Sequence, residues 1–118
     1  MTEAELADRS CEACTSEDEP LEGEELEELH DQIDTAIWSI IDEHHLEGNF
    51  EFEDFRDALE FTKEIGELAE EEWHHPDIHL AWGEVQVEMW THKIDGLHEA
   101  DFVMAARMDR LYDPYRPE

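Results

Sequence analysis

Apolar residues switch between two spacings along this chain, and that alternation limits the possible folds more than any other feature of the sequence. In 22–38, EGEELEELHDQIDTAIW, they recur every three or four positions, whereas in 84–92, EVQVEMWTH, they occupy alternate positions. The first spacing builds an apolar stripe on a helix, and the second puts apolar side chains on one face of a strand. The chain is therefore expected to contain both helices and strands.

The predicted elements follow one another in the order α-β-β-α-β-β-α. They are a helix within 22–38, strands near 37–42 and 45–52, a helix from Asp54 to the residues before Pro76, strands over 77–82 and 84–92 joined at Gly83, and a helix over about 98–112. The second helix ends before its proline because the residue preceding a proline is pushed out of the helical conformation. This order predicts a two-layer α+β fold, in which a four-stranded antiparallel sheet carries the helices on one face.

The predicted core positions follow from the same spacings. In the helices they are Leu26, Leu29, Ile33, Ile37, Phe55, Ala58, Leu59, Thr62, Ile65, Leu68, Ala69, Met104, Ala105, Met108 and Leu111. In the last strand, Val85, Val87 and Met89 are expected on one face, and Gln86, Glu88, Trp90 and His92 on the other. A sheet with helices on one side leaves its other face open. Because that face would carry Trp90, we expect further copies of the chain to pair there, as a homodimer or homotetramer.

The charge balance is strongly acidic, since 36 Asp and Glu residues face 7 Lys and Arg residues, for a formal net charge of −29. Such a surface repels phosphate backbones, so nucleic-acid binding is not expected. The composition resembles that of cytosolic proteins from salt-accumulating halophiles. High charge also favours disorder, but hydrophobic residues make up 40% of the chain and lie at periodic positions, which favours a folded domain.

Residues 1–20 show no sustained spacing and end in an acidic run, so we expect an extended or mobile arm there and the folded domain at 21–118. The arm carries Cys11 and Cys14 in a single CxxC, which supplies only two of the four ligands of a structural zinc site. The N-terminus has neither the basic leader nor the apolar segment of a secretory signal, and no apolar run of about 18 residues follows it. A cytoplasmic protein without a membrane span is expected.

Two adjacent histidines, His74 and His75, stand against Pro76 at the predicted end of a helix. A structural interpretation is available, because an imidazolium at a helix C-terminus is stabilised by the helix dipole. A metal site is a second interpretation, with His79 and His92 as further ligands. Neighbouring side chains on a helix point about 100° apart, however, and neither HExxH nor a second CxxC supports the metal site.

General acid/base chemistry is the third interpretation. His74 at the helix end and His92 at the end of the last strand are expected at the same edge of the sheet. An imidazole in water titrates at about pH 6.5, so that one ring can donate a proton while another accepts one. Asp101, early in the last helix, is the carboxylate expected to orient one of the rings. Spacing alone does not choose among the three interpretations.

One spaced pattern runs through the second half of the chain: Glu70, then His74, His75 and Pro76, then Trp82, His92 and Asp101. In residue types and in every spacing it resembles the motif of the pterin-4a-carbinolamine dehydratases. FEFEDFRDALEF at 50–61 and THKIDGLHEADF at 91–102 are also similar to segments of that family. The resemblance covers essentially the whole chain and favours catalysis.

The resemblance implies a lyase that works without a metal or a bound cofactor. Its substrate would be a 4a-hydroxytetrahydropterin, left when an aromatic amino acid hydroxylase activates oxygen, and dehydration to the quinonoid dihydropterin would recycle a tetrahydrobiopterin-type cofactor. By the same resemblance, the catalytic residues would be His74, His75, His92 and Asp101. The substrate contacts would be Glu70, His74, His75, Pro76, Thr91, His92, Lys93 and Ile94.

Two alternative functions stay open beside this one. Related proteins occur in organisms that lack such hydroxylases, which points to another reduced pterin as substrate, for example in molybdopterin metabolism. Some animal relatives act as dimerisation cofactors of a homeodomain transcription factor, so a non-catalytic binding role is the second alternative. The chain also departs from many family members at Asp95-Gly96, where they have two small residues, and this places a change at the rim of the expected pocket.

Overall fold

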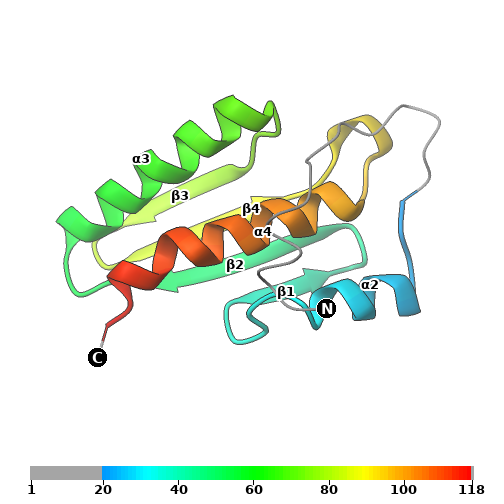
Figure 1. The fold of residues 1–118 in the computed structure, drawn as a ribbon, viewed down its shortest axis with the longest axis horizontal. Coiled ribbons are helices and arrows are strands. Elements are labelled where there is room, and N and C mark those ends of the chain that lie inside the picture. The colour runs from blue at the N-terminus through cyan, green and yellow to red at the C-terminus, as the bar shows by residue number, and fades with distance from the viewer. Residues whose placement is uncertain (1–19, 118) are drawn as a thin grey trace.

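The computed structural model describes residues 20–117 (Figure 1). Cys11 and Cys14, and with them nearly all of the expected N-terminal arm, lie outside the described residues. The elements in chain order are α2 (Glu24–His30), β1 (Trp38–Ile41), β2 (His45–Glu51), α3 (Phe55–Glu72), β3 (Asp77–Ala81), β4 (Glu84–Met89), the 3₁₀ turn η1 (His92–Ile94), α4 (Glu99–Tyr112) and the 3₁₀ turn η2 (Asp113–Tyr115).

One antiparallel sheet forms a layer of the fold, with the strand order β1-β2-β4-β3. The helices α2, α3 and α4 lie on the same face of this sheet, with α4 between the other two (Figure 1). The alternating buried positions of β4 are Val85, Val87 and Met89, as predicted. The prediction of an α+β fold with a four-stranded antiparallel sheet is confirmed. Within residues 20–117, no helix is long and apolar enough to cross a membrane.

Helix α2 is shorter than the helix predicted within 22–38. Ile33 and Ile37, the last two core positions predicted for this helix, are nevertheless buried, in the turns that follow α2. A buried carboxylate of α4, Asp109, holds these turns in place because it accepts hydrogen bonds from Asp34 N (3.0 Å) and from Trp38 Nε1 (2.8 Å). This contact between distant parts of the chain replaces the last turns of the expected helix.

Helix α3 buries a slightly different face from the one predicted. Phe55 and Leu59, expected in the core, are 44% and 47% exposed, so this part of the prediction is wrong. Phe61 is fully buried instead, and its ring centre lies 4.7 Å from that of Phe50 and 5.7 Å from that of Tyr112. The buried stripe is rotated towards Phe61 because that ring fills the space between the sheet and α4 and removes a large apolar surface from water.

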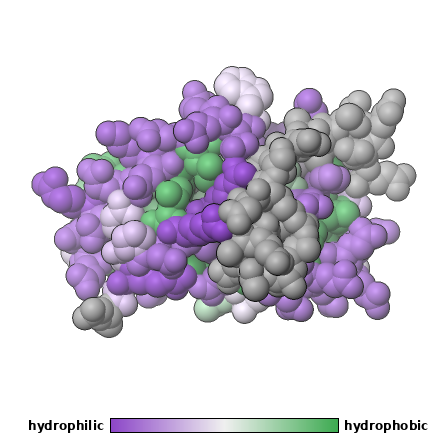
Figure 2. Space-filling view, in the orientation of Figure 1, coloured by the Kyte–Doolittle hydropathy of each residue, from purple (hydrophilic) through white to green (hydrophobic). Residues whose placement is uncertain are grey.

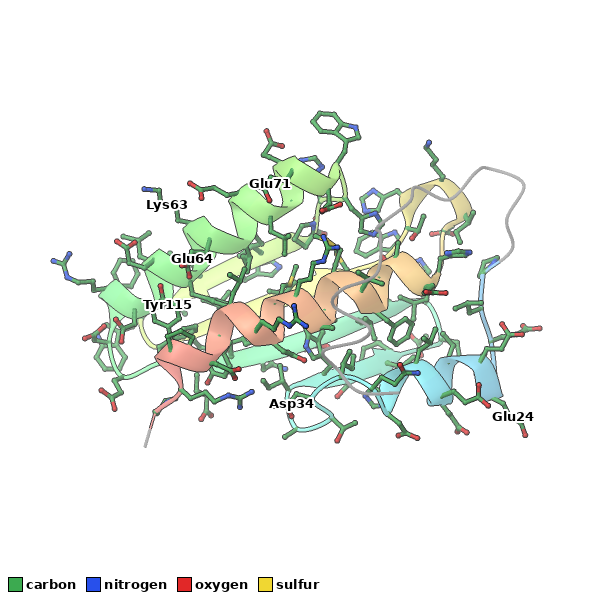
Figure 3. All side chains as sticks on the ribbon, in the orientation of Figure 1. Glu24, Asp34, Lys63, Glu64, Glu71 and Tyr115 are labelled. Atoms are coloured by element: carbon green, nitrogen blue, oxygen red, sulfur yellow. The ribbon has the colours of Figure 1, made fainter. Side chains whose placement is uncertain are left out.

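The C-terminal part of the described chain is fastened to both layers. Tyr112 of α4 donates a hydrogen bond to Glu51 O of β2 at 2.6 Å. Tyr115 of η2 lies beside Glu64 of α3 (Figure 3), and burial, together with a hydrogen bond to Glu64, raises the pKa of the Tyr115 hydroxyl to about 12. The C-terminal end of helix α4, which carries Asp101 near its other end, is therefore fastened to the sheet and, through η2, to α3.

Strand β1 meets β2 through a close contact between Trp38 and Gly48. The two residues are partners in the strand register, and Trp38 is fully buried. A Cβ atom added at Gly48 would lie 2.7 Å from Cε3 and from Cζ3 of the indole, well inside van der Waals contact. The position therefore needs glycine because the tryptophan ring occupies the space of a side chain.

Gly48→Ala is accordingly expected to lower the free energy of unfolding by about 1–3 kcal/mol, the usual cost of overpacking a core. Gly66→Ala is the matched control, because Gly66 lies inside α3 and an added Cβ would meet nothing within 4 Å. Alanine should raise the stability there by about 0.5–1 kcal/mol, since it is a better helix former. Urea unfolding measures both effects. A Gly48→Ala protein as stable as the wild type would contradict the contact.

The open face of the sheet is polar. His45 Nε2 and His79 Nε2 lie 3.6 and 3.4 Å from the carboxylate of Glu88, on three neighbouring strands. Trp90, which was expected on this face, is half-buried against His44 and His45. On the opposite, helical face, the described residues that are visible are also mostly hydrophilic, with hydrophobic residues in patches (Figure 2). Pairing of copies through the open face stays a prediction.

Strand β4 ends at Met89, so that His92 lies on η1 and not at the end of a strand as predicted. Thr91 causes this change, because its N and O atoms pair with Gly96 O (2.8 Å) and Gly96 N (3.4 Å) and close a loop over 91–96. Asp95 in this loop has a positive φ of 50°. His92 is exposed on this loop.

Candidate active site

The backbone at the end of α3 determines where His74 and His75 point. Trp73, the residue after the helix, has a left-handed conformation (φ 52°, ψ 46°), and His74 N donates to Ala69 O at 3.1 Å. Pro76 follows, and it keeps the preceding residue out of the helical conformation. The two imidazoles therefore do not follow the geometry of α3, and both reach the same cavity.

A buried carboxylate holds the ring of His74. His74 Nε2 lies 2.6 Å from Asp101 Oδ1, and Asp101 is completely buried. The other oxygen, Oδ2, accepts hydrogen bonds from Thr91 Oγ1 at 2.8 Å and from His98 N at 2.9 Å. These donors satisfy a carboxylate that has no contact with water. Asp101 thus connects the end of α3, the loop after β4 and the first turn of α4.

His75 has a carboxylate partner of its own. Its Nε2 forms a hydrogen bond with Glu70 Oε2, which lies about one turn back in α3. Both side chains are exposed, the glutamate more than the histidine. The rings of His75 and Trp73 meet at an angle of 85°, with their centres 5.0 Å apart. Water competes for the exposed Glu70 more than for the buried Asp101, so His75 is held less firmly than His74.

His92 approaches the two other histidines from η1. Its ring is stacked on Trp90, with the ring centres 4.5 Å apart and the planes 20° apart. The His44 ring lies 5.4 Å from the same indole, and His44 Nε2 is 2.7 Å from Asp95 Oδ1. The loop that carries His92 is therefore braced against the β1–β2 hairpin at two points, through Trp90 and through Asp95.

One cavity of about 260 Å³ collects these groups. Its lining residues are Trp73, His74, His75, Trp90, Thr91, His92 and Lys93. Of the other predicted site residues, Asp101 and Glu70 lie behind the imidazoles that they bind. Pro76 and Ile94 are next in sequence to lining residues without lining the cavity themselves. The predicted residues thus lie in the cavity wall or beside it, and their catalytic and binding roles stay predictions.

The two tryptophans of the wall, Trp73 and Trp90, were not among the predicted site residues. A signal for Trp73 was present, since it directly precedes the histidine pair. The aromatic residue of the spaced motif, Trp82, lies in another hollow of the surface, next to Phe55 and Leu59. The aromatic surface at the site thus comes from positions that the motif does not include.

The arrangement suits proton transfer to and from a flat molecule. Three imidazoles line one cavity, and an imidazole is a side chain that can serve as a general acid or as a general base. Two indoles in the same wall offer flat apolar surfaces for a ring system. Within residues 20–117, no group of three or more His, Cys, Asp or Glu side chains is arranged to hold a metal ion.

Comparison with known proteins identifies the family. The family model described as pterin 4 alpha carbinolamine dehydratase matches residues 19–111. The chain belongs to this family. A relative in Rubrobacter xylanophilus, whose name assigns it as a pterin-4-alpha-carbinolamine dehydratase, is 52% identical over 108 residues, which cover 92% of this chain and 99% of the relative. A relative of the same name in Alkaliphilus metalliredigens is 46% identical over 105 residues, or 89% of this chain and 94% of that protein.

Solved structures also place the chain in the pterin carbinolamine dehydratase family. The crystal structure of the transcriptional coactivator/pterin dehydratase from Brucella melitensis matches it with a TM-score of 0.73 and 30% sequence identity. The match covers 78% of this chain and 97% of that one. The dehydratase resemblance predicted from the spaced histidine motif is therefore confirmed at the level of the family.

Proposed function

We propose that the chain is a hydro-lyase that removes water from a 4a-hydroxytetrahydropterin and forms the quinonoid dihydropterin. One observation carries this proposal: His74, which is bound to the buried Asp101, lines the same cavity as His92. Membership of the dehydratase family supports the choice of a pterin carbinolamine as substrate.

The reaction needs two proton transfers and no oxidation or reduction. The bond between C4a and its hydroxyl oxygen breaks, and the oxygen takes up a proton and leaves as water. N5 loses its proton, and the electron pair of that N–H bond forms the double bond to C4a. A proton donor at the hydroxyl and a proton acceptor at N5 are therefore required, and each is typically worth about 10²–10⁴ in rate.

We assign the acceptor role to His74. A neutral His74 that donates its Nε2 proton to Asp101 keeps an unprotonated Nδ1, which is free to take the proton from N5. The carboxylate of Asp101 then stabilises the imidazolium that forms. His92, the third imidazole of the cavity, lies exposed on η1, and we assign it as the donor to the departing hydroxyl.

The other predicted site residues bind the substrate in this proposal. His75, held by Glu70, and the side chains of Thr91 and Lys93 contact the pterin, while Pro76 and Ile94 shape the two turns. Neither a metal nor a bound cofactor takes part. We further propose a cytoplasmic homodimer or homotetramer, adapted to high salt, that recycles the tetrahydropterin of an aromatic amino acid hydroxylase.

A turnover assay tests the proposed function. A 4a-hydroxytetrahydropterin is generated chemically in situ, and its conversion to the quinonoid product is followed by absorbance at high potassium chloride concentration. The purified protein should accelerate dehydration above the spontaneous rate in proportion to its concentration, and heat-denatured protein should not. A folded protein that leaves the spontaneous rate unchanged would contradict the proposal and favour a different reduced pterin.

A further inference from the structure

Trp73 combines an unfavourable backbone conformation with an exposed side chain. Its φ of 52° and ψ of 46° lie in the left-handed region, which residues with a Cβ adopt at a cost and which glycine or asparagine adopts most readily at a helix end. Within the described part of the chain, the other residues outside glycine with positive φ are Asp42, Glu43 and Asp95, all of them acidic. Among these residues with positive φ, Trp73 is the one with a large aromatic side chain.

Packing within the described chain does not compensate for this conformation. Trp73 is 76% exposed, so most of its indole surface is open to solvent. The helix end itself needs only the left-handed backbone, which glycine or asparagine would provide with less strain. The left-handed backbone is explained by the end of the helix, whereas the presence of a tryptophan side chain at this position is not.

The position of the indole suggests what it is for. Trp73 lines the same cavity as His74, and its ring meets that of His75 at an angle of 85°. The other indole in the wall, Trp90, is already stacked on His92. An open indole beside the imidazoles can cover a flat heteroaromatic ring held in the cavity. A residue that costs stability and faces a binding cavity is often retained for function.

We propose that Trp73 is a substrate-contacting residue, whose indole stacks on the bicyclic ring of the pterin and sets the affinity of the site. This inference rests on the proposed function for the identity of the ring. Stacking of an aromatic side chain on a nucleobase, a ring system of similar size, changes binding by about 10-fold or more. The indole should act on KM more than on kcat, because the stack is present in the ground state as well as in the transition state.

Three variants separate this contact from a structural role. Trp73→Asn should raise KM by about 10-fold with little change in kcat. Its melting temperature should equal or exceed that of the wild type, because asparagine tolerates the left-handed conformation better. Trp73→Phe keeps an aromatic face and should recover most of the affinity. Trp82→Asn is the matched control, since Trp82 is 70% exposed and lies outside the cavity, and its KM should match the wild type.

Calorimetric titration with 7,8-dihydrobiopterin, a stable pterin without the 4a-hydroxyl, separates this inference from the proposed function. If the wild type dehydrates its substrate but Trp73→Asn has an unchanged KM, the inference is wrong and the function stands. A loss of stability in Trp73→Asn with a parallel fall in kcat would also overturn it, since that pattern indicates a structural role. If the wild type binds the pterin in a Trp73-dependent way without dehydrating the carbinolamine, the inference holds and the proposed function fails.

Discussion

Replacing His92 with alanine is expected to lower kcat/KM for pterin dehydration by about 10²–10⁴ and to leave the stability of the protein unchanged. The His92 ring is exposed on η1 and rests on the face of Trp90, so its removal leaves no buried group without a partner. What the variant loses is the proton donor for the departing hydroxyl. Rates measured under single-turnover conditions, beside urea unfolding curves, check both parts of this expectation.

His74→Ala should reduce the rate by a similar factor, but it should also destabilise the fold. Asp101 is buried, and loss of its hydrogen bond to the His74 ring costs about 1–3 kcal/mol.

The double variant, His74→Ala with His92→Ala, should be hardly slower than the slower of the two single variants, because both rings act in one chemical step. His79→Ala is the control, since His79 is exposed on β3 outside the cavity. Equal losses in His79→Ala and His92→Ala would indicate a general charge effect and contradict the assigned roles.

Asp101→Asn is expected to remove most of the activity from a protein that still folds. Asparagine has one acceptor oxygen where aspartate has two. Thr91 Oγ1 and His98 N both donate to Oδ2, so the amide oxygen should take that position and the amide NH₂ should face His74 Nε2. The His74 ring must then accept a hydrogen bond at Nε2 and carry its proton on Nδ1. That tautomer cannot take a proton from the substrate at Nδ1.

The expected loss for Asp101→Asn is about 10²-fold or more in kcat with little change in KM, because the fault lies in the tautomer and not in substrate binding. Nitrogen NMR of the His74 ring should show the proton moving from Nε2 to Nδ1. Glu70→Gln is the matched control, since it alters the exposed partner of His75 by the same change of chemistry, and its effect should be smaller. Normal kcat in Asp101→Asn would show that the carboxylate does not orient the base.

The order of the elements could be predicted from the sequence because apolar spacing is a local signal. The exceptions all depend on contacts between distant residues. Helix α2 ends early because Asp109 of α4 binds the turns after it, and the buried face of α3 is set by Phe61 packing against Phe50 and Tyr112. His92 was expected on a strand because the alternation of β4 continues in the sequence, whereas the pairing of Thr91 with Gly96 ends the strand.

The site could be predicted in part for a related reason. The spaced histidine motif identified His74 and Asp101, which are 27 residues apart and meet at 2.6 Å. The motif does not report Thr91 and His98 as further partners of that carboxylate, because their contribution depends on how the 91–96 loop and the start of α4 meet. Trp73 was missed because a tryptophan after a helix is unremarkable until its left-handed backbone and its exposure are known.

Binding of a pterin against the three imidazoles of the cavity is tested most directly by proton NMR of the histidine rings during titration with 7,8-dihydrobiopterin. Resonances are assigned from the single alanine variants. The Cε1 protons of His74, His75 and His92 should shift together and saturate, while those of His30 and His79, outside the cavity, should stay in place. Saturating ligand that leaves the three cavity resonances unmoved, or that shifts only those of His30 and His79, would contradict the proposed site.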